Sequence, residues 1–384
     1  MKVLFWGTLD VADGGPAMSS YLTLKGLRMG NVNAEIAVYR HSDGHTLVGN
    51  NIPIHDCHKP WPGRMAYSPW LKKELRSVAG VDIYHAHGVW QYPTYALCDV
   101  ARSQGKPYLI SPRGMLYPQD IAKSHAWLKQ LSLRWRLLDD LNGAACIHAT
   151  CTEEREHCRA LGVKAPIAVI PNPVENKSYP PCHHDGVFRV GYLGRLSPRK
   201  YVEKLILAFA HLNLKGAELV IIGGGDKGYE RRLRDLVAQL GLCQVRFTGF
   251  LSGKAKDEAL ASLSVLALPS EFENWGNVVL EALVRGIPCI VTQGAPWSVL
   301  VEERCGWWVP FDQQAIEEAL TEAARCSAGE LEAMGERGRR VVTERYSVES
   351  VARRMKELYA WVMNPKGDAK PDFVDMDCPT CDKD

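Results

Sequence analysis

Two carboxylates, Glu273 and Glu281, flank a Gly-Asn step, with seven residues between them. The apolar run 265–268, stopped by a proline, predicts a buried parallel strand, so Glu273 is expected in the loop at that strand's carboxyl end. Ligands of open α/β sheets bind at such ends. Glu281 is expected about one turn into the next helix, whose first N–H groups, near Asn277, suit a phosphate. This loop is therefore predicted to hold a sugar, a ribose and a diphosphate.

Two cations follow another expected strand, at 188–192. Arg195 and Lys200 stand in the turn 194–200, where they can hold a diphosphate through charge-assisted bonds worth about 1.5 to 3 kcal/mol each. A solvated basic turn is the alternative. It is less favoured because the two glutamates follow an equivalent strand end in the same part of the chain.

A glycine-rich turn at 223–228 satisfies the G-x-G-x-x-G pattern of dinucleotide sites. That fingerprint also requires an acidic residue about 20 positions further on, and the segment 244–248 contains none. We therefore assign Gly223, Gly224 and Gly225 to a tight turn near the ligand rather than to a nicotinamide cofactor.

The first half of the chain carries a second glycine turn and a histidine pair. Gly14 and Gly15 precede an expected helix and let a backbone approach an anion closely, with a simple flexible turn as the alternative. Strand alternation places His85 and His87 on one side. A metal pair is less favoured because no carboxylate or cysteine stands nearby. His87 is predicted to face a cleft, and a histidine satisfied in the core is the alternative.

Short apolar runs alternate with longer helical patterns, which predicts parallel sheets covered by helices on both faces. The expected strands are 2–6, 35–39, 82–85, 108–111, 145–148 and 168–170 in a first set, and 189–193, 218–222, 245–247, 264–268, 289–292 and 306–309 in a second. The segment 171–186, rich in proline and polar residues, separates the sets as an interdomain linker. A final helix is expected at 348–363.

The composition limits the number of domains and the classes of function that the chain can have. A chain of 384 residues, 46% hydrophobic and 23% charged, is too large for one typical core, so two domains are expected. The formal net charge of +2 gives no reason to expect nucleic acid. Apolar runs stay well below the roughly 18 residues of a membrane span, so a cytoplasmic protein is expected.

The twelve cysteines mostly stand singly in apolar segments, as reduced, buried side chains do. Cys378 and Cys381 have the spacing of metal ligands but lack a second pair. Two free thiols in a disordered tail are favoured over a metal or redox site.

From residue 3 to about residue 362 the chain resembles the family-4 retaining glycosyltransferases of the glycosyltransferase-B fold. The motifs that carry the resemblance are the glycines at 14 and 15, the turn 194–200, the turn 223–226 and the run 273–288. The resemblance implies an α/β protein of two Rossmann-like domains facing a cleft, with a C-terminal helix that crosses back to the first domain. The expected bounds are 1–171 for an acceptor-binding domain, 172–187 for the linker, 188–346 for a nucleotide-sugar-binding domain, 347–363 for the crossover helix and 364–384 for a disordered tail.

The resemblance also implies residue roles. Arg195 and Lys200 would neutralise the donor diphosphate, Glu281 would bind the ribose and Glu273 would bind hydroxyls of the transferred sugar; Glu273, Arg195 and Lys200 form the expected catalytic set. The other expected donor-binding positions are Gly14, Gly15, Gly194, Gly223, Gly224, Gly225, Phe250, Asn277 and Val278.

The reaction implied is hexosyl transfer from a nucleotide diphosphate sugar, of UDP or GDP type, with retention of anomeric configuration by front-face attack and with no metal or other cofactor. Cations and a helix N-terminus would act where the leaving-group charge appears. Another glycosyltransferase architecture uses a metal-binding Asp-x-Asp. Such a triplet at 375–377 is discounted because it falls in the expected tail.

One departure concerns the first domain. Many relatives carry a histidine after the fourth strand that contacts the donor sugar, whereas this chain reads Ser-Pro-Arg-Gly-Met at 111–115. Arg113 is expected in that place, facing the cleft with a fixed positive charge that suits an acidic sugar or a phosphate on the acceptor. An arginine paired with a neighbouring loop is the alternative. His87, Trp90 and Arg113 are the expected acceptor or cleft residues.

The motifs, with the segment 292–297, look most like the branch that builds exopolysaccharide, capsule or O-antigen on glycan or lipid-linked glycan acceptors. The segment 123–138 combines Trp127 and Trp135 with lysines and arginines, as interfacial amphipathic helices do. A helix packed on a sheet, with long cations over its rim, has the same composition. Peripheral contact with the inner face of the membrane is therefore one of two expectations.

Two rival functions remain. A sugar-nucleotide epimerase on the same fold would bind the donor without an acceptor. A non-catalytic assembly protein that kept the fold is less favoured because the predicted diphosphate-binding cations and both glutamates are present. The sequence does not identify the sugar, the nucleotide base or the acceptor.

Overall fold

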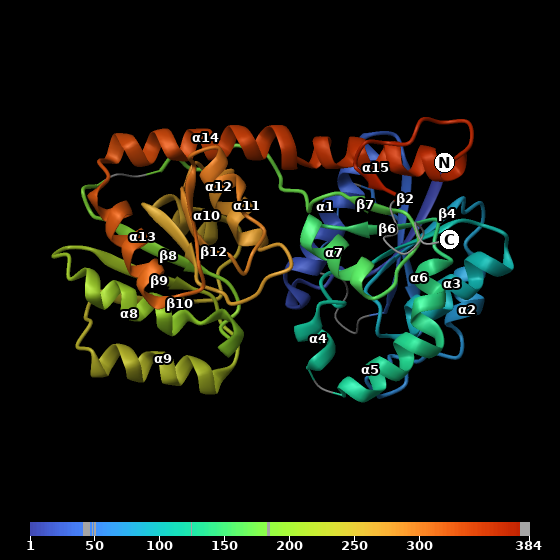
Figure 1. Cartoon of the computed structure of the whole chain (residues 1–384), viewed down its shortest axis with the longest axis horizontal. Coiled ribbons are helices and arrows are strands. Elements are labelled where there is room, and N and C mark those ends of the chain that lie inside the picture. The colour runs from blue at the N-terminus through green and yellow to red at the C-terminus, as the bar shows by residue number, and fades with distance from the viewer. Residues whose placement is uncertain (41–46, 48, 50, 124, 183–184, 377–384) are drawn as a thin grey trace, which may run out of the picture. The chain divides into compact units, whose positions relative to one another are not determined.

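The computed structural model describes residues 1–40, 47, 49, 51–123, 125–182 and 185–376 (Figure 1). The chain divides into two compact units, Met1–Pro173 with Val348–Asp384, and Val174–Ser347. We call them the first unit and the second unit and describe each by itself. Cys378 and Cys381 lie outside the described residues.

The first unit contains a sheet that, over the described residues, has the strand order β14-β7-β6-β5-β4-β1-β2-β3. Every pairing is parallel except that of β14 with β7. The strands are β1 (Lys2–Trp6), β2 (Asn33–Tyr39), β3 (Ile54–Cys57), β4 (Ile83–His87), β5 (Tyr108–Ser111), β6 (Cys146–Ala149), β7 (Ile167–Val169) and β14 (Val374–Asp375). Its α-helices are α1 (Gly15–Met29), α2 (Leu71–Ser77), α3 (Tyr92–Ser103), α4 (Pro118–Ala122), α5 (Ala126–Ser132), α6 (Leu138–Asn142), α7 (Thr152–Ala160) and α15 (Val348–Met363).

The second unit contains an all-parallel sheet with the order β10-β9-β8-β11-β12-β13 over the described residues. The strands are β8 (Arg189–Leu193), β9 (Glu218–Ile222), β10 (Val245–Gly249), β11 (Val265–Leu268), β12 (Cys289–Thr292) and β13 (Gly306–Val309). Its α-helices are α8 (Val202–Leu212), α9 (Lys227–Gln239), α10 (Gly253–Ala261), α11 (Asn277–Leu283), α12 (Val299–Glu302), α13 (Gln313–Arg325) and α14 (Ala328–Tyr346).

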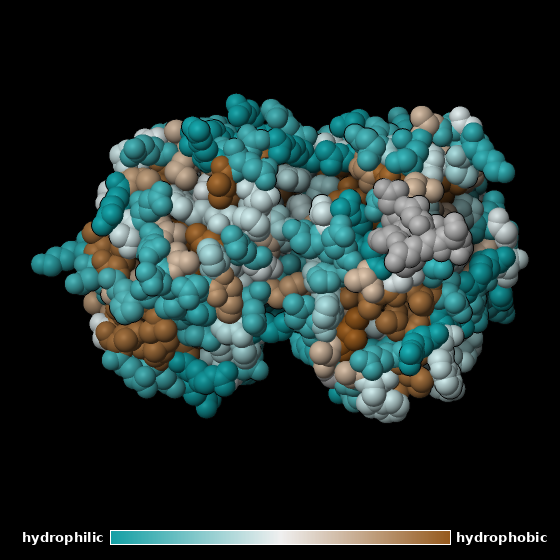
Figure 2. All heavy atoms as spheres, viewed as in Figure 1, coloured by the Kyte–Doolittle hydropathy of each residue, from teal (hydrophilic) through white to brown (hydrophobic). Residues whose placement is uncertain are grey.

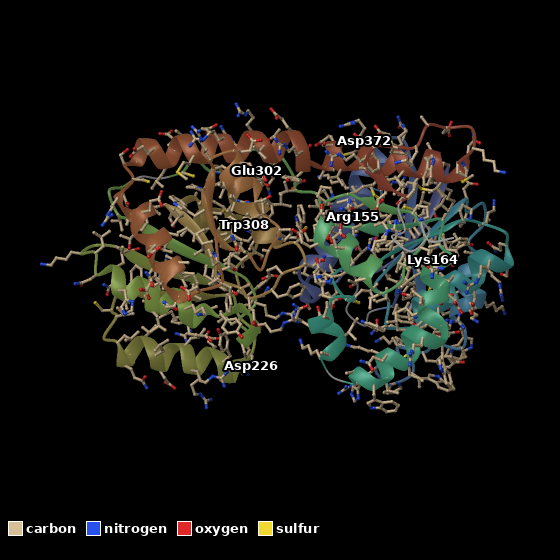
Figure 3. The ribbon with its side chains drawn as sticks, in the orientation of Figure 1. Arg155, Lys164, Asp226, Glu302, Trp308 and Asp372 are labelled. Carbon is tan, nitrogen blue, oxygen red and sulfur yellow. The ribbon has the colours of Figure 1, made fainter. Side chains whose placement is uncertain are left out.

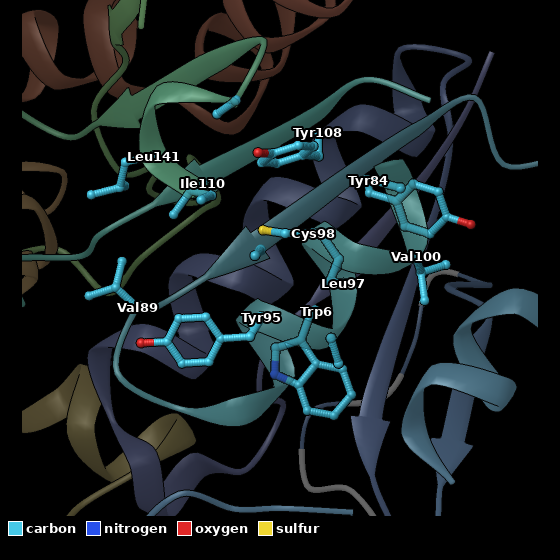
Figure 4. Close-up of a cluster of buried hydrophobic side chains, with 14 of the residues drawn as sticks. Trp6, Tyr84, Val89, Tyr95, Leu97, Cys98, Val100, Tyr108, Ile110 and Leu141 are labelled. Carbon is cyan, nitrogen blue, oxygen red and sulfur yellow. The ribbon is translucent and has the colours of Figure 1, made fainter. Parts of the chain in front are cut away.

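Side-chain alternation explains why the strands of the first unit are apolar along their whole length. Leu4 and Trp6 of β1 belong to one buried cluster, whereas Val3 and Phe5 belong to another. Figure 4 shows members of the first cluster, with Trp6 next to Tyr95 and Leu97 of α3. Both faces of this sheet are therefore covered, as parallel sheets require.

The last helix belongs to the first unit. Met355, Leu358 and Tyr359 of α15 are fully buried in the cluster that contains Val3 and Phe5. A Cβ on Gly26 of α1 would lie 2.7 Å from the carbonyl oxygen of Val348, so glycine permits the close approach of these two helices. On the face shown in Figure 2, mostly hydrophilic residues cover the outer edge of α14 and α15. The expectation that the C-terminal helix returns to the first domain is confirmed.

The twelve expected strands are all present, within two residues of their predicted bounds, but two further strands were missed. β3 reads Ile-His-Asp-Cys and lies at the edge of the sheet, where it pairs with β2 alone, so it lacks a continuous apolar run. β14 lies in the segment 364–384 that was expected to be disordered. That expectation is wrong for β14, because Val374 is 1% exposed and pairs with Ala168 of β7.

None of the helices within the described residues is long and apolar enough to cross a membrane.

Candidate functional site

Glu273 is held in a defined position after β11. Its Oε1 accepts a hydrogen bond of 2.7 Å from Oγ of the fully buried Ser270, and its backbone N–H donates to the carbonyl of Gly294 at 2.8 Å. A Cβ on Gly294 would lie 2.1 Å from the carbonyl oxygen of Glu271, so only glycine allows the loop after β12 to approach this closely. The loop after β11 is thus fixed by the loop of the neighbouring strand.

Lys200 meets Glu273, although 73 positions separate them. The Lys200 ammonium donates to Oε1 of Glu273, and the side chains are 24% and 13% exposed. Lys200 ends a short 3₁₀ turn, Pro198–Lys200, after β8, which is the direct neighbour of β11 in the sheet. Adjacent parallel strands therefore bring the predicted cation and the predicted carboxylate to one sheet edge.

The glycine turn after β9 packs against the turn after β8. A Cβ on Gly223 would lie 1.9 Å from the carbonyl oxygen of Gly194, and one on Gly225 would lie 2.3 Å from that of Leu196. The backbone N–H of Leu196 donates to the carbonyl of Gly224 at 3.0 Å. Close backbone approach thus accounts for the glycines at 223 and 225.

Asp226, labelled in Figure 3, caps the helix that follows this turn. Its Oδ1 accepts a hydrogen bond of 2.6 Å from the backbone N–H of Tyr229. Phe250 stands next to the same turn, because the N–H of Gly223 donates to the carbonyl of Gly249 at 2.9 Å. The Phe250 side chain is 69% exposed and so remains accessible to a ligand.

Arg195 follows β8 directly, and its carbonyl oxygen accepts a hydrogen bond of 3.1 Å from the hydroxyl of the buried Tyr192. The residue is thus tied to the strand through its backbone.

Glu281 lies in α11 and pairs with a lysine that the sequence analysis did not single out. Lys256 Nζ of α10 donates to Glu281 Oε2 at 2.7 Å. Helix α11 begins after Gly276, whose φ of 78° lies in the left-handed region that favours glycine. Asn277 and Val278 are its first residues, as predicted. Lys256 lies in a segment of helical periodicity that matches no binding motif, so the local sequence pattern did not single it out.

An aromatic cluster supports the start of α11. The fully buried Trp297 donates its indole N–H to the carbonyl of Trp275 at 2.6 Å. The rings of Trp275, Trp297 and Tyr346 lie within 5.2 to 5.9 Å of one another. The loop 273–276 is therefore anchored from the side of the core.

In the first unit, a row of buried, neutral side chains is linked by hydrogen bonds. The direction of each bond follows from the last one, in which a backbone carbonyl can only accept. His148 Nε2 must donate to the carbonyl of Ile170 at 2.8 Å, so its Nδ1 accepts from Ser111 Oγ, also at 2.8 Å. Ser111 then accepts from His85 Nε2 at 2.8 Å, and His85 Nδ1 accepts from the Tyr359 hydroxyl at 2.8 Å. Every polar atom along the chain from Tyr359 to Ile170 is satisfied.

Burial lowers the pKa of His148 to about 3 and holds the pKa of His85 well below its ordinary value. Both imidazoles are neutral at pH 7. Because both nitrogens of His85 are engaged, these contacts give no support to a metal pair formed by His85 and His87. The described residues contain no group of three or more His, Cys, Asp or Glu side chains that could hold a metal ion.

His87 and Arg113 contact each other. Ser20 Oγ donates to the carbonyl of Pro16 at 2.9 Å, so it accepts from His87 Nδ1 at 3.0 Å. His87 Nε2 is then free to accept from Arg113 Nη2 at 3.2 Å, and Arg113 Nη1 donates to Asn172 Oδ1 at 2.5 Å. The guanidinium is therefore held by uncharged acceptors.

Burial controls the protonation of this pair. It lowers the pKa of the Arg113 guanidinium to about 10 and, together with the Arg113 charge, holds the pKa of His87 well below its ordinary value. Arg113 is thus a cation at pH 7 beside a neutral His87. Its backbone φ of 57° is left-handed, at the turn that follows β5.

The other predicted residues of the first unit are Gly14, Gly15 and Trp90. Gly14 caps α1 with a φ of 68°, and Gly15 is the first residue of that helix. Trp90 donates its indole N–H to the carbonyl of Met115 at 3.0 Å, and the Lys129 ammonium lies over its ring.

In the second unit the structure thus joins Lys200 with Glu273 and packs the glycine turn after β9 against the turn after β8. It joins His87 with Arg113 in the first unit. Glu281 pairs with Lys256 instead of with Lys200. The functional roles of these residues stay predictions.

Comparison with known proteins gives matches in both halves. Residues 14–173 match the family model described as a glycosyl transferase 4-like domain, and residues 182–341 match that of glycosyl transferases group 1. The chain is 32% identical over 181 residues to the uncharacterized glycosyltransferase MJ1607 of Methanocaldococcus jannaschii, which covers 46% of this chain and 45% of that protein. It is 34% identical over 162 residues to a GDP-mannose-dependent alpha-mannosyltransferase of Mycolicibacterium smegmatis, which covers 42% and 40%. The chain thus spans less than half the length of these curated relatives.

Among solved structures, HepE of Anabaena in complex with UDP and glucose aligns with a TM-score of 0.76 and 19% identity, over 94% of this chain and 99% of that one. The fold is shared over nearly the whole chain.

Proposed function

The chain belongs to the family-4 glycosyltransferases and has the glycosyltransferase-B fold, and from this premise we propose that it transfers a hexosyl group from a nucleotide diphosphate sugar to a glycan or lipid-linked glycan acceptor. In this proposal the second unit binds the donor, of UDP or GDP type, and the first unit binds the acceptor.

The pairing of Lys200 with Glu273 carries the proposal. The anionic oxygens of a diphosphate can pair with the Lys200 ammonium, and sugar hydroxyls can donate hydrogen bonds to the Glu273 carboxylate. A bound donor would therefore replace the ion pair between these residues by two charge-assisted contacts. Ser270 keeps Glu273 in place during this exchange, since its Oγ lies 2.7 Å from Oε1. Arg195 supplies the second cation after the same strand as Lys200.

The two glutamates have separate partners, Lys200 for Glu273 and Lys256 for Glu281. This favours binding roles over the acid and nucleophile roles that paired carboxylates play in glycoside hydrolases. Glu281 is proposed to bind the ribose, and Glu273 the transferred sugar.

We propose transfer with retention, without a metal ion or other cofactor. The acceptor oxygen attacks the anomeric carbon from the face that the diphosphate leaves, the bond from that carbon to the diphosphate oxygen breaks, and a phosphate oxygen takes the acceptor's proton. Lys200 and Arg195 stabilise the negative charge that grows on the leaving group.

Arg113 is proposed to favour an anionic substrate. Its side chain is half-buried, its hydrogen-bond acceptors Asn172 and His87 are neutral, and the buried carboxylate of Glu154 lies near enough to raise its pKa. A carboxylate of an acidic sugar or a phosphate of the acceptor would add a further anionic partner for this charge. The assignment to surface-polysaccharide synthesis rests on the motifs and is part of the same proposal.

The test begins with the donor. A panel of nucleotide sugars is screened for thermal stabilisation, since a ligand at 100 times its dissociation constant adds about 2.7 kcal/mol to the unfolding free energy. The stabilising donor is then incubated alone and with glycan acceptors. A transferred sugar whose anomeric configuration matches the donor by NMR is expected; an inverted product would refute retention, and an isomerised donor without acceptor would favour an epimerase.

The residue assignments are tested with Lys200→Ala and Glu273→Ala. Each is expected to lower kcat/KM for transfer by about 100-fold or more, because it removes a preorganised charge at the reacting group. Lys215→Ala is the matched control, since this exposed lysine lies in the same unit, in the loop before β9. Transfer at full rate in both site variants would show that the roles are wrong.

A further inference from the structure

The helical segment 126–136 of the first unit projects from the core. It comprises α5 and most of a five-residue π-helical stretch, Leu133–Leu137, that continues into α6. No residue of α5 is buried, and Leu137, directly after the segment, is the first buried residue. Figure 1 shows α5 at the margin of the first unit.

The apolar side of this segment is the exposed side. Trp127 is 66% exposed and Trp135 is 77% exposed, and Leu128 and Leu131 are exposed as well. At about 100° per residue these four side chains fall within roughly 100° of the helix circumference. Surface helices of soluble proteins turn such a stripe toward the core. Here the two tryptophan side chains of the stripe point to solvent over most of their surface.

The charge around the stripe is positive. Residues 123–138 contain Lys123, Lys129, Arg134 and Arg136 and no aspartate or glutamate. Arg136 forms ion pairs with aspartates of the first unit, and Lys129 lies over Trp90. Lys123 and Arg134 are exposed and, in the described part of the chain, no carboxylate lies within ion-pair distance of either.

A neighbouring loop extends the same surface. Trp61 and Met65 are 57% and 51% exposed. Arg64, between them, donates to His125, which precedes α5, and the carbonyl of Arg64 accepts from Gln91 at 3.4 Å. The loop is therefore tied to the start of the projecting helix.

We propose that this aromatic-basic face, made of Lys123, Trp127, Leu128, Leu131, Arg134 and Trp135, docks the first unit on an anionic lipid bilayer. Tryptophan suits the boundary between headgroups and acyl chains, because its ring is apolar and its N–H is polar. Lys123 and Arg134 would meet anionic headgroups, worth about 1 kcal/mol for each cation near the surface. A second copy of the chain fits less well, since a symmetric contact would place these cations against each other.

The first experiment measures sedimentation of the full chain with vesicles of phosphatidylcholine alone or of phosphatidylcholine with phosphatidylglycerol. Binding to the anionic vesicles, weakened by salt, is expected. Trp127→Ser and Trp135→Ser are each expected to lower the partition coefficient about tenfold, because each removes one aromatic side chain that the bilayer would bury. Lys123→Gln and Arg134→Gln are each expected to lower it about fivefold on anionic vesicles only.

Matched controls come from exposed positions of the second unit. Leu240→Ser removes an exposed apolar side chain and Arg340→Gln removes an exposed cation, and neither is expected to change vesicle binding. All of these side chains are exposed, so the variants should keep the thermal midpoint of the parent chain.

The proposal extends beyond sugar transfer and does not depend on it, because vesicle binding is measured without donor or acceptor. Failure of the parent chain to bind anionic vesicles would overturn it. So would equal binding by the tryptophan variants and the controls. A dimer that the tryptophan variants convert to monomer, without vesicle binding, would identify the face as a self-association surface instead.

Discussion

Two groups of polar side chains, one in each unit, are positioned in opposite ways. In the second unit, Lys200 with Glu273 and Lys256 with Glu281 are charged pairs with partly exposed side chains. In the first unit, the chain of Tyr359, His85, Ser111 and His148 is buried and neutral. Partly exposed ion pairs contribute little to stability, because solvent screens them. A buried neutral network is costly to disturb, because water cannot replace a lost partner.

This difference separates stability from ligand exchange. The charged pairs of the second unit can change partners when a donor binds. The network of the first unit fixes β4, β5, β6 and α15 relative to one another. Arg113 combines both features, since it is a half-buried cation whose hydrogen-bond acceptors, Asn172 and His87, are neutral.

The largest expected effect is on the pH dependence of stability in the first unit. His85, His87 and His148 have pKa values lowered by burial, that of His148 from 6.5 to about 3. The unfolded chain takes up protons at these histidines below pH 6.5 while the folded state does not, so the unfolding free energy falls as pH falls from 6.5 toward 3. At pH 5.5 the loss from His148 alone is about 1.4 kcal/mol, and His85 and His87 add to it in the same direction.

Urea unfolding at pH 7.5 and pH 5.5 measures this loss of unfolding free energy. Hydrogen exchange at the same two pH values shows which strands lose protection. Protection should decrease in β4, β5 and β6 and change little in β8 and β11. Equal losses in both units would contradict the assignment of this pH dependence to the buried histidines of the first unit.

The second prediction concerns backbone packing in the second unit. Gly223→Ala is expected to destabilise the protein by about 3 kcal/mol, because the new Cβ would lie 1.9 Å from the carbonyl of Gly194, at a φ of +141°. Gly224→Ala is the control, since its nearest neighbour would be 4.0 Å away. Thermal unfolding of both variants checks the difference. If Gly223→Ala left the thermal midpoint unchanged, close backbone packing would not explain the glycine at position 223.

The third prediction compares two buried tyrosines. Tyr359→Phe removes the donor to His85 Nδ1 and is expected to lower the unfolding free energy by about 1 to 3 kcal/mol. Tyr192→Phe removes a longer bond, of 3.1 Å, to the carbonyl of Arg195 and is expected to have the smaller effect. Urea unfolding ranks the two variants, and the reverse order would weaken the case for a tightly coupled network in the first unit.

The smallest expected effect is that of Lys256→Met. Loss of the ammonium frees Glu281 to move, so KM for the donor should rise by about 3- to 10-fold, with kcat and thermal stability nearly unchanged. Lys254→Met, a lysine whose side chain is 88% exposed in the same helix, is the control. A fall in kcat with unchanged KM would assign Lys256 to the reacting group rather than to donor positioning.

Much of the fold followed from the sequence. The apolar runs of β1, β5, β8, β9, β12 and β13 were predicted with their observed bounds, because strands buried on both faces are apolar throughout. The turn after β8 and the loop after β11 were also found, since their polar residues follow such runs directly. β3 and β14 were missed because both are short edge strands without a continuous apolar run.

What the sequence determined by itself is the set of elements and the chemistry they carry, including Arg195, Lys200, Glu273 and Glu281. Only the tertiary structure decided which of these groups meet. Lys200 reaches Glu273 across 73 positions, and Tyr359 reaches His85 across 274. It also decided that Trp127 and Trp135 face solvent, which helical periodicity alone left open. The physical reason is that contact and burial depend on strand order and packing, which couple residues far apart in the chain, whereas local patterns report only on neighbours.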